Sequence, residues 1–151
     1  MTKQALASFR LQSPIVDFHA ANFENSSIYL SGGSTTEAKV DQSNGKSTKT
    51  TVTLATVYRY DLNQNRWETA PRLNESRKLH SSCTKGGSLY VFAGQKGKDC
   101  GRGRRFVRSI EQLRVSRAQQ VWTLIELDDH LTRIRAAICP INTLSILILG
   151  G

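Results

Sequence analysis

The sequence has no long hydrophobic run. The longest, residues 144–149, is interrupted by Ser145, whereas a helix that spans a bilayer needs about 18 apolar residues. The first 16 residues also lack the continuous apolar core of about seven residues that a secretory signal requires. We therefore expect neither a membrane span nor a secretory leader. A transit peptide is the alternative, because Lys3 and Arg10 precede the first acidic residue, Asp17.

Cysteine is scarce. Cys83, Cys100 and Cys139 are odd in number and lack the CxxC spacing of zinc sites and the density of a disulfide scaffold. This usage favours a reducing compartment, so we expect the chain to be cytoplasmic. Cys100 lies among basic residues that lower a thiol pKa, which makes a reactive thiol the alternative to an inert one.

The usual catalytic and cofactor motifs are absent. There is no GxSxG nucleophile turn and no Walker loop, and the glycines of 94–103 do not have the spacing of a dinucleotide fingerprint. The contiguous acids and histidine of 128–130 do not converge on one centre and are typical of a polar loop. We therefore expect no enzyme activity, no cofactor and no metal site.

A repeated segment is present instead. SIYLSGG (27–33), SLYVFAG (88–94) and SILILGG (145–151) share a serine, an apolar run and a small-glycine end. His19 and His80 precede the first two copies by the same number of residues. Repeats of this length indicate stacked β-units, and no stretch of the sequence shows a helical period of useful length.

Each repeat reads as four short strands, a to d. Period-two alternation, clearest in Val57 to Leu62, together with turn residues between the runs predicts these strands. The predicted ranges are 14–23, 77–83 and 135–141 for strand a; 27–33, 88–94 and 145–151 for b; 56–62 and 109–115 for c; and 66–70 and 121–127 for d. Pro140 is expected to mark the end of its strand. The predicted class is all-β.

These motifs in this order resemble the kelch repeat, with Arg77-x-x-His80, LYVFAG and TVYRYDL followed by a tryptophan. The resemblance implies a β-propeller of four-stranded blades, in which a double glycine ends strand b and a Tyr-Asp pair lies on strand c. The second unit departs from the pattern at Ala93 and at Leu113-Arg114, and the third has Ala137 near the histidine position. The residues that carry the signature are His19, Gly32, Gly33, Tyr60, Asp61, Trp67, His80, Gly94, Trp122, Gly150 and Gly151.

The repeats divide the chain into an N-terminal extension and about two and a half blades. The predicted units are 1–13 (extension), 14–71 (repeat 1, with a long b-to-c loop at 34–55), 72–127 (repeat 2, with a basic b-to-c loop at 95–108) and 128–151 (truncated repeat 3). A propeller needs more blades to close. We therefore expect a piece of a longer protein or a shortened gene model, and otherwise partner copies or an exposed sheet edge.

Two repeated residue types have both a structural and a functional interpretation. The spacing of His19 and His80 favours structural positions on successive strands over a metal or catalytic site. Trp67 is interpreted as packing between blades rather than as a ring for ligand stacking.

The loop at 95–108 carries five of the nine net positive charges of the chain. In the proteins that this chain resembles, the b-to-c and d-to-a loops form the partner-binding face, which implies that the basic residues here contact a partner. Guanidinium groups pair with carboxylates and phosphates, so an acidic or phosphorylated protein segment is expected. The predicted contact residues are Arg77, Lys78, Arg102, Arg104, Arg105, Arg108, Arg133 and Arg135.

The sequence thus predicts a protein-interaction module. The resemblance implies substrate recognition in a ubiquitin ligase adaptor or a scaffold for cytoskeletal partners. Three alternatives stay open: nucleic-acid binding, which the pI of 9.9 favours; a piece of a propeller-based oxidase or isomerase; and a basic loop that is only a solvated insertion.

Overall fold

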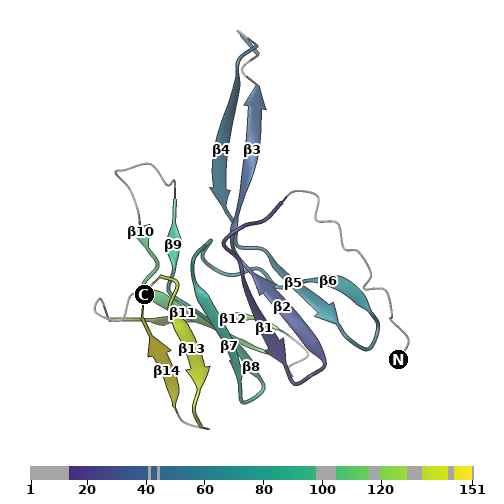
Figure 1. Ribbon diagram of the computed structural model, residues 1–151, viewed down its shortest axis with the longest axis vertical. Helices are drawn as coiled ribbons and strands as arrows, with labels where there is room; N and C mark the ends of the chain where they lie inside the picture. Colours follow the sequence, from purple (N-terminus) through teal and green to yellow (C-terminus); the bar gives the residue numbers. More distant parts are fainter. Residues whose placement is uncertain are drawn as a thin grey trace.

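The computed structural model describes residues 14–40, 42–43, 45–97, 105–115, 120–128, 134–142 and 145–150. Every regular element in these residues is a β-strand, and all paired strands are antiparallel (Figure 1). The prediction of an all-β chain is therefore confirmed. No helix that could cross a membrane occurs in this part of the chain.

The first four-stranded sheet, called sheet I, has the order β1-β2-β5-β6. Its strands are β1 (His19–Phe23), β2 (Ser27–Ser31), β5 (Val57–Asp61) and β6 (Arg66–Ala70). The Asp61 carboxylate ends β5 by accepting hydrogen bonds from the amides of Asn63 and Gln64, at 2.9 and 3.0 Å. Asn65 then takes a positive φ of 54°, which asparagine tolerates, and the chain turns into β6.

The second four-stranded sheet, called sheet II, repeats this order as β7-β8-β11-β12. Its strands are β7 (Ser81–Lys85), β8 (Ser88–Phe92), β11 (Ser109–Arg114) and β12 (Trp122–Glu126). The first strand begins four residues later than predicted. The reason is Leu79, whose positive φ of 54° breaks the extended conformation before Ser81.

A two-stranded hairpin follows, made of β13 (Ala137–Pro140) and β14 (Ile146–Leu149). Pro140 is the last residue of β13, as predicted. The inner strands β1, β7 and β13 are neighbours, so the three sheets fan out from one side (Figure 1). The described residues do not form a closed ring of sheets.

A repeated backbone contact links the three sheets. Asp17, Leu79 and Arg135 each precede an inner strand, and all three have positive φ, at 56°, 54° and 55°. The Leu79 amide donates to the Asp17 carbonyl at 3.1 Å, and the Arg135 amide donates to the Leu79 carbonyl at 2.8 Å. Left-handed backbone costs about 1–2 kcal/mol for a residue with a Cβ. We infer that these inter-sheet bonds offset that cost.

The segment predicted as a loop at 34–55 is largely a hairpin, which corrects the sequence interpretation. β3 (Ser34–Val40) pairs with β4 (Ser47–Thr53) over seven residue pairs. Its Ser, Thr and Lys content is loop-like, but Thr and Val are β-branched and favour strands. A shorter hairpin joins β9 (Gln95–Lys96) to β10 (Arg105–Phe106). Both hairpins extend from the same side of the molecule, as expected of the b-to-c loops (Figure 1).

The core lies between the facing surfaces of sheets I and II. Sheet I contributes Ala21, Phe23, Tyr29 and Val57, and sheet II contributes Leu89, Val91, Leu113 and Trp122, with Leu73 from the connection between the sheets. Fully burying such a side chain stabilises the fold by about 1.5–3 kcal/mol. Apolar burial therefore contributes to the stability of the contact between sheets I and II.

We predict that Leu113→Ala lowers the free energy of unfolding by about 2–5 kcal/mol, because Leu113 is fully buried in this core and the substitution leaves a cavity. Urea denaturation followed by tryptophan fluorescence measures the change. Leu124→Ala, on the neighbouring strand and 45% exposed, is the control and should change stability by about 0.5 kcal/mol or less. Equal losses in the two variants would contradict this location of the core.

Candidate functional site

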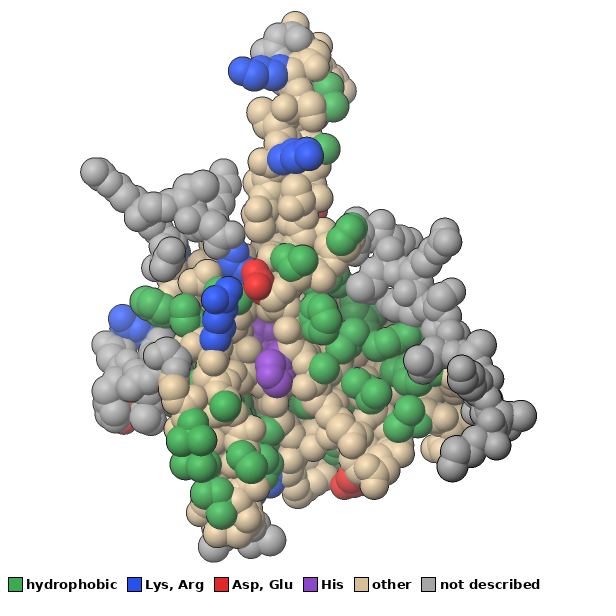
Figure 2. Space-filling model, viewed as in Figure 1, with side chains coloured by type: hydrophobic (Ala, Val, Ile, Leu, Met, Phe, Trp, Pro, Cys, Tyr) green, Lys and Arg blue, Asp and Glu red, His purple; other side chains and the backbone are tan. Residues whose placement is uncertain are grey.

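The candidate site lies on the side of the molecule from which both hairpins extend. It is formed by the connector 71–80 between the two sheets, the β9–β10 hairpin and the nearby ends of β11 and β12. Figure 2 shows basic side chains near the point where β9–β10 joins the sheets, with histidine side chains beside them. This is the side where the sequence predicted a basic partner-binding face.

Arg77 does not belong to that exposed face, which corrects the sequence prediction. Its side chain is completely buried. One guanidinium nitrogen donates to the carbonyls of Ala93 and Ser109, at 3.1 and 3.0 Å. The other donates to the Ser109 hydroxyl at 3.0 Å and to the Glu111 carboxylate at 2.6 Å. Burial lowers the pKa of Arg77, and the Glu111 carboxylate opposes this effect.

Glu111 holds the connector in place. It is as completely buried as Arg77. Besides the ion pair, its carboxylate accepts hydrogen bonds from the amides of Asn74 and Glu75, at 2.6 and 3.1 Å. Each buried charge therefore has several partners, which a charge removed from water needs.

Lys78 is also buried, with 1% of its surface exposed. Its backbone forms an isolated β-bridge with Gln95, in which each amide donates to the other residue's carbonyl at 2.9 Å. Its predicted place on an exposed face is therefore wrong. The sequence could not reveal that these charged residues are buried. For Arg77, the groups that accept its hydrogen bonds lie far along the chain, at Ala93, Ser109 and Glu111.

Glu75 joins the connector to the base of the β9–β10 hairpin. Its carboxylate pairs with the Lys96 ammonium at 2.7 Å and accepts a hydrogen bond from the Ser109 hydroxyl at 2.6 Å. Burial alone would raise the pKa of Glu75, but the hydrogen bonds from Lys96 and Ser109 outweigh it and lower the pKa. Glu75 is thus an anion that the basic residues of the site partly neutralise.

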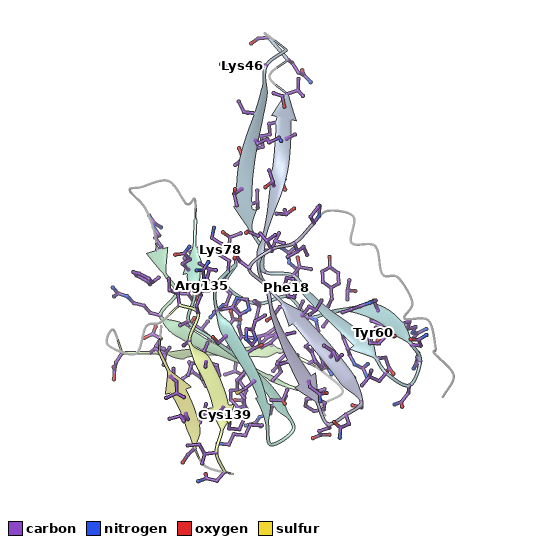
Figure 3. All side chains as sticks on the ribbon, in the orientation of Figure 1. Phe18, Lys46, Tyr60, Lys78, Arg135 and Cys139 are labelled. Carbon is purple, nitrogen blue, oxygen red and sulfur yellow. The ribbon has the colours of Figure 1, made fainter. Side chains whose placement is uncertain are left out.

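Three of the predicted arginines are exposed on this side: Arg105, Arg108 and Arg135. Arg135 lies beside the connector, since its amide donates to Leu79 (Figure 3). Arg102, Arg104 and Arg133 lie outside the described residues. The exposed part of the predicted basic face is therefore smaller than the sequence suggested.

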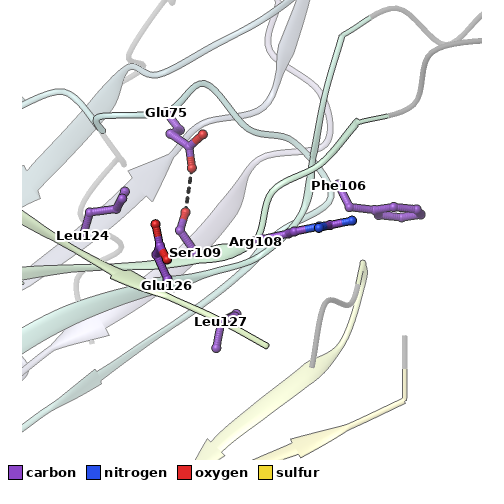
Figure 4. Close-up of a pocket in the computed structure, with 7 residues that line it drawn as sticks. All are labelled: Glu75, Phe106, Arg108, Ser109, Leu124, Glu126 and Leu127. Carbon is purple, nitrogen blue, oxygen red and sulfur yellow. Dashed lines mark hydrogen bonds between the residues drawn. The ribbon is translucent and has the colours of Figure 1, made fainter. Parts of the chain in front are cut away.

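One of these arginines, Arg108, lines an open cleft of about 430 Å³. Arg108 and Phe106 extend at one end, and the carboxylate of Glu126 lies near Ser109 (Figure 4). Phe106 and Leu124 are 50% and 45% exposed. The lining residues are Glu75, Phe106, Arg108, Ser109, Leu124, Glu126 and Leu127.

Sequence reasoning missed this cleft because its walls come from three segments that the fold brings together. The one available signal was the alternation on β12, which places Leu124 and Glu126 on the same face as Trp122. Arginine beside exposed apolar side chains suits a ligand that has both an anionic group and an apolar group.

The repeated histidines lie on the inner side of the sheets and are engaged within the fold. His80 is buried, and its Nε2 atom lies 2.9 Å from the Ser31 hydroxyl. His19 accepts a hydrogen bond at Nδ1 from the Ser82 amide at 3.2 Å. The two ring centroids are 6.3 Å apart. These contacts favour a structural role, and the described residues contain no group of three or more potential metal ligands.

Burial strongly affects the charge of these rings. It lowers the pKa of His80 to about 3, with smaller effects of the same sign from Arg77 and His19. It also lowers the pKa of His19. Both rings are therefore neutral in the folded protein at neutral pH.

The signature glycines provide space for the connector. A Cβ at Gly32 would collide with the Arg77 carbonyl and lie 2.7 Å from His80 Cε1. A Cβ at Gly94 would lie 2.8 Å from the Lys78 carbonyl oxygen. Gly33 has φ +95° and donates its amide to the Arg77 carbonyl at 2.8 Å. Gly150 has open space around it, and Gly151 lies outside the described residues.

The two tryptophans occupy equivalent positions with different surroundings. Trp122 is buried between the sheets, and its indole nitrogen donates to the Pro71 carbonyl at 2.7 Å. Trp67 is half-buried and packs on Tyr60 of its own sheet, with 5.0 Å between ring centroids. Packing between sheets is therefore observed for Trp122, whereas the contact described for Trp67 is within sheet I.

No protein-family model and no curated protein matches the chain. Among solved structures, that of YjhT matches 89% of this chain with a TM-score of 0.62 at 15% sequence identity. The chain spans 43% of the length of that structure. At this identity the match shows a shared fold only.

We predict that Glu111→Gln lowers the free energy of unfolding by about 3–5 kcal/mol, because it leaves the buried Arg77 charge without its carboxylate. Equilibrium urea unfolding measures the loss. Glu126→Gln, an exposed carboxylate on the adjacent strand, is the control and should stay within about 0.5 kcal/mol of the parent. A loss at Glu111 no larger than the control's would rule out the stabilising role of the ion pair.

We also predict that stability falls as the pH is lowered from about 6.5 towards 3. The pKa of His80 is about 3 in the folded protein, against an ordinary histidine value of 6.5, so the unfolded chain binds more protons in this range and acid favours unfolding. His80→Gln should reduce the slope of unfolding free energy against pH by up to about 1.4 kcal/mol per pH unit. Parallel slopes for the parent and the variant would show that His80 does not carry this dependence.

Proposed function

We propose that the chain is a protein-interaction module built as part of a kelch-type β-propeller. Sheets I and II would be complete blades, and the β13–β14 hairpin would be the first half of a third. Three observations support this: the repeated four-strand order, the adjacent inner strands and the glycines packed against the His80 segment. The shared fold with part of a larger solved structure agrees with it.

We propose that the partner is an acidic or phosphorylated protein segment that binds along the cleft. The observation that carries this proposal is the position of the exposed Arg108 and Phe106 at the same end of the cleft. Arg105, the residue before Phe106 on β10, is a second exposed arginine near this end, although it does not line the cleft. Bidentate pairing would hold a carboxylate or phosphate, while Phe106 and Leu124 would receive an apolar side chain next to it.

Binding is proposed rather than catalysis because the buried ionisable groups serve the fold. Arg77 and Glu111 fix the connector, and His80 packs against Gly32 and Ser31. A role as a ligase adaptor or as a cytoskeletal scaffold would use the same surface.

A reducing, cytoplasmic location is part of the proposal. Cys83 is a buried free thiol, and burial raises its pKa to about 11, so it is an inert thiol. Cys139 is free and exposed, which suits a compartment where thiols stay reduced.

We predict that the chain binds a fluorescein-labelled peptide in which phosphoserine and glutamates flank a leucine. Arg105→Glu combined with Arg108→Glu should weaken binding by on the order of tenfold or more, since a charge-assisted hydrogen bond contributes about 1.5–3 kcal/mol. Fluorescence anisotropy at fixed ionic strength measures the affinity. Replacing the leucine by serine should also weaken it, because the apolar part of the cleft then stays unfilled.

The matched control is Arg66→Glu with Arg114→Glu. It makes the same change of net charge with two exposed arginines outside the cleft, Arg66 at the start of β6 and Arg114 at the end of β11. Equal weakening by both double variants would refute the cleft as the site. Tighter binding of a single-stranded oligonucleotide, with a steep dependence on salt, would replace the protein partner by nucleic acid.

A further inference from the structure

β12 is the outer edge strand of sheet II. In the described part of the chain it pairs only with β11, so one side of its backbone faces away from the sheet. Four of its five residues are exposed, and Glu126 is its only charged residue. Edge strands with few charges, no proline and no bulge offer their backbone groups to other chains. β6, the equivalent strand of sheet I, carries two charges, at Arg66 and Glu68, so the edge of β12 is the more open to pairing.

The ladder between β11 and β12 determines which backbone groups face outwards. The Leu127 amide donates to the Arg108 carbonyl at 2.9 Å. Along an antiparallel ladder, hydrogen-bonded pairs alternate with pairs that are not hydrogen-bonded. Every second residue from Leu127 back along β12 therefore bonds to β11. The residues between them include Leu124 and Glu126, which direct their amides and carbonyls to the outer edge.

The connector from sheet I already uses one outward group of this edge. The side-chain amide of Asn74 donates to the Trp122 carbonyl at 3.2 Å. Trp122 lies two residues before Leu124, so its carbonyl faces the same outer edge. The connector thus reaches the edge at Trp122, and no described strand pairs with it at Leu124 and Glu126. An added strand has room to pair from Leu124 onwards.

The same two residues belong to the lining of the cleft. Leu124 and Glu126 both line it, because side chains two residues apart on a strand share a face. An extended segment paired with this edge would therefore place every second side chain over the cleft. Leu124 would contact an apolar side chain of the segment. Arg108 and Phe106 lie beyond Glu126 as seen from Leu124 (Figure 4), so the positive charge is near the carboxyl end of β12.

We propose that the acidic segment binds as an added antiparallel strand on β12, with its apolar residue opposite Leu124. The inference rests on the proposed binding in the cleft and adds the backbone conformation and the residue order of the partner. Main-chain hydrogen bonds supply affinity in this mode of recognition, and the cleft selects the side chains.

The direction of the strand sets the order of residues in the partner. Both neighbouring pairs of sheet II, β11 with β12 and β11 with β8, are antiparallel, and antiparallel pairs are the commoner kind. The amino-terminal part of the segment then lies beside the carboxyl end of β12, near Arg108. Its anionic residues therefore precede its apolar residue. The position directly opposite Glu126 is not acidic, because like charges across a strand pair are destabilising.

Methylation of the peptide backbone tests the pairing without any change to the protein. The probe is a fluorescein-labelled peptide in which phosphoserine and glutamates precede a Thr-x-Leu sequence, and it is added to the 151-residue chain. The leucine amide would donate to the Leu124 carbonyl and the threonine amide to the Glu126 carbonyl. Methylation of either amide should weaken binding by about fivefold or more. Methylation of the amide between them, which points away from β12, should weaken it by less than about twofold.

A second peptide tests the direction of the strand. It has the same composition, but its phosphoserine and glutamates follow the leucine. These anions would lie towards Asn74 and away from Arg108, so the affinity should fall by on the order of tenfold. Equal or tighter binding of this peptide overturns the antiparallel orientation.

Two variants of one residue test the outward amide of β12. Glu126→Pro removes the amide, and proline is tolerated on an edge strand where the amide faces solvent. Glu126→Ala keeps the amide and should bind the acidic peptide more tightly than the parent, because it removes a carboxylate beside it. The proline variant should bind on the order of tenfold more weakly than the alanine variant. Equal affinities of these two variants contradict a hydrogen bond from the Glu126 amide.

Failure of the added strand and failure of the cleft give different results. If binding depends on Arg105 and Arg108 but methylation shows no alternation, the added strand is overturned and the cleft remains. A peptide that does not bind, or that binds the Arg105→Glu, Arg108→Glu variant equally well, refutes the proposed function and the strand with it. If Glu126→Pro fails to fold, the methylated peptides still decide, because they use the parent chain.

Discussion

The buried ion pair between Arg77 and Glu111 is the interaction on which the arrangement of the two sheets depends. The Arg77 backbone belongs to the end of sheet I, since its amide donates to Leu54 and its carbonyl accepts from Gly33. Its guanidinium belongs to sheet II, where it binds Glu111. Arg77 therefore contacts both sheets. A buried charge is costly unless its partners are present, so the positions of the groups around the Arg77 guanidinium can vary little.

The fixed position of the Arg77 segment explains why glycines and a histidine occur at the repeated positions. Strand formation alone does not require these residue types. Gly32 has no Cβ because the Arg77 carbonyl and the His80 ring occupy that space. Gly94 makes the equivalent approach to the Lys78 carbonyl. The repeated glycines thus lie where the connector passes close to the end of a strand. The same connector contributes Glu75 to the wall of the cleft.

Much of the fold could be predicted because its strands obey local rules. Alternation in Val57 to Asp61 and the Gly86-Gly87 turn specify strands and hairpins without tertiary information. The β3–β4 hairpin was missed because Thr, Ser and Lys are common in loops as well as in exposed strands. The positive φ of Leu79 could not be predicted either, since leucine rarely adopts it and only the bonds to neighbouring sheets explain it.

The candidate site was predicted only in part, for a related reason. Arg105, Arg108 and Arg135 are exposed, but Arg77 and Lys78 look the same in the sequence and are buried. Charge predicts exposure on average, and it fails where acceptors from distant segments surround the group. The cleft escaped prediction because no single segment contains it.

Sheets I and II also differ at the position of Glu111, the residue that binds the connector. Register places Tyr58 of sheet I where sheet II has Glu111. The corresponding face of sheet I therefore lacks the carboxylate that binds Asn74, Glu75 and Arg77 in sheet II, and it carries aromatic and aliphatic side chains instead. Apolar packing tolerates small displacements that a buried ion pair does not. The interface between sheets I and II is thus fixed in its geometry by the buried ion pair as well as by apolar packing.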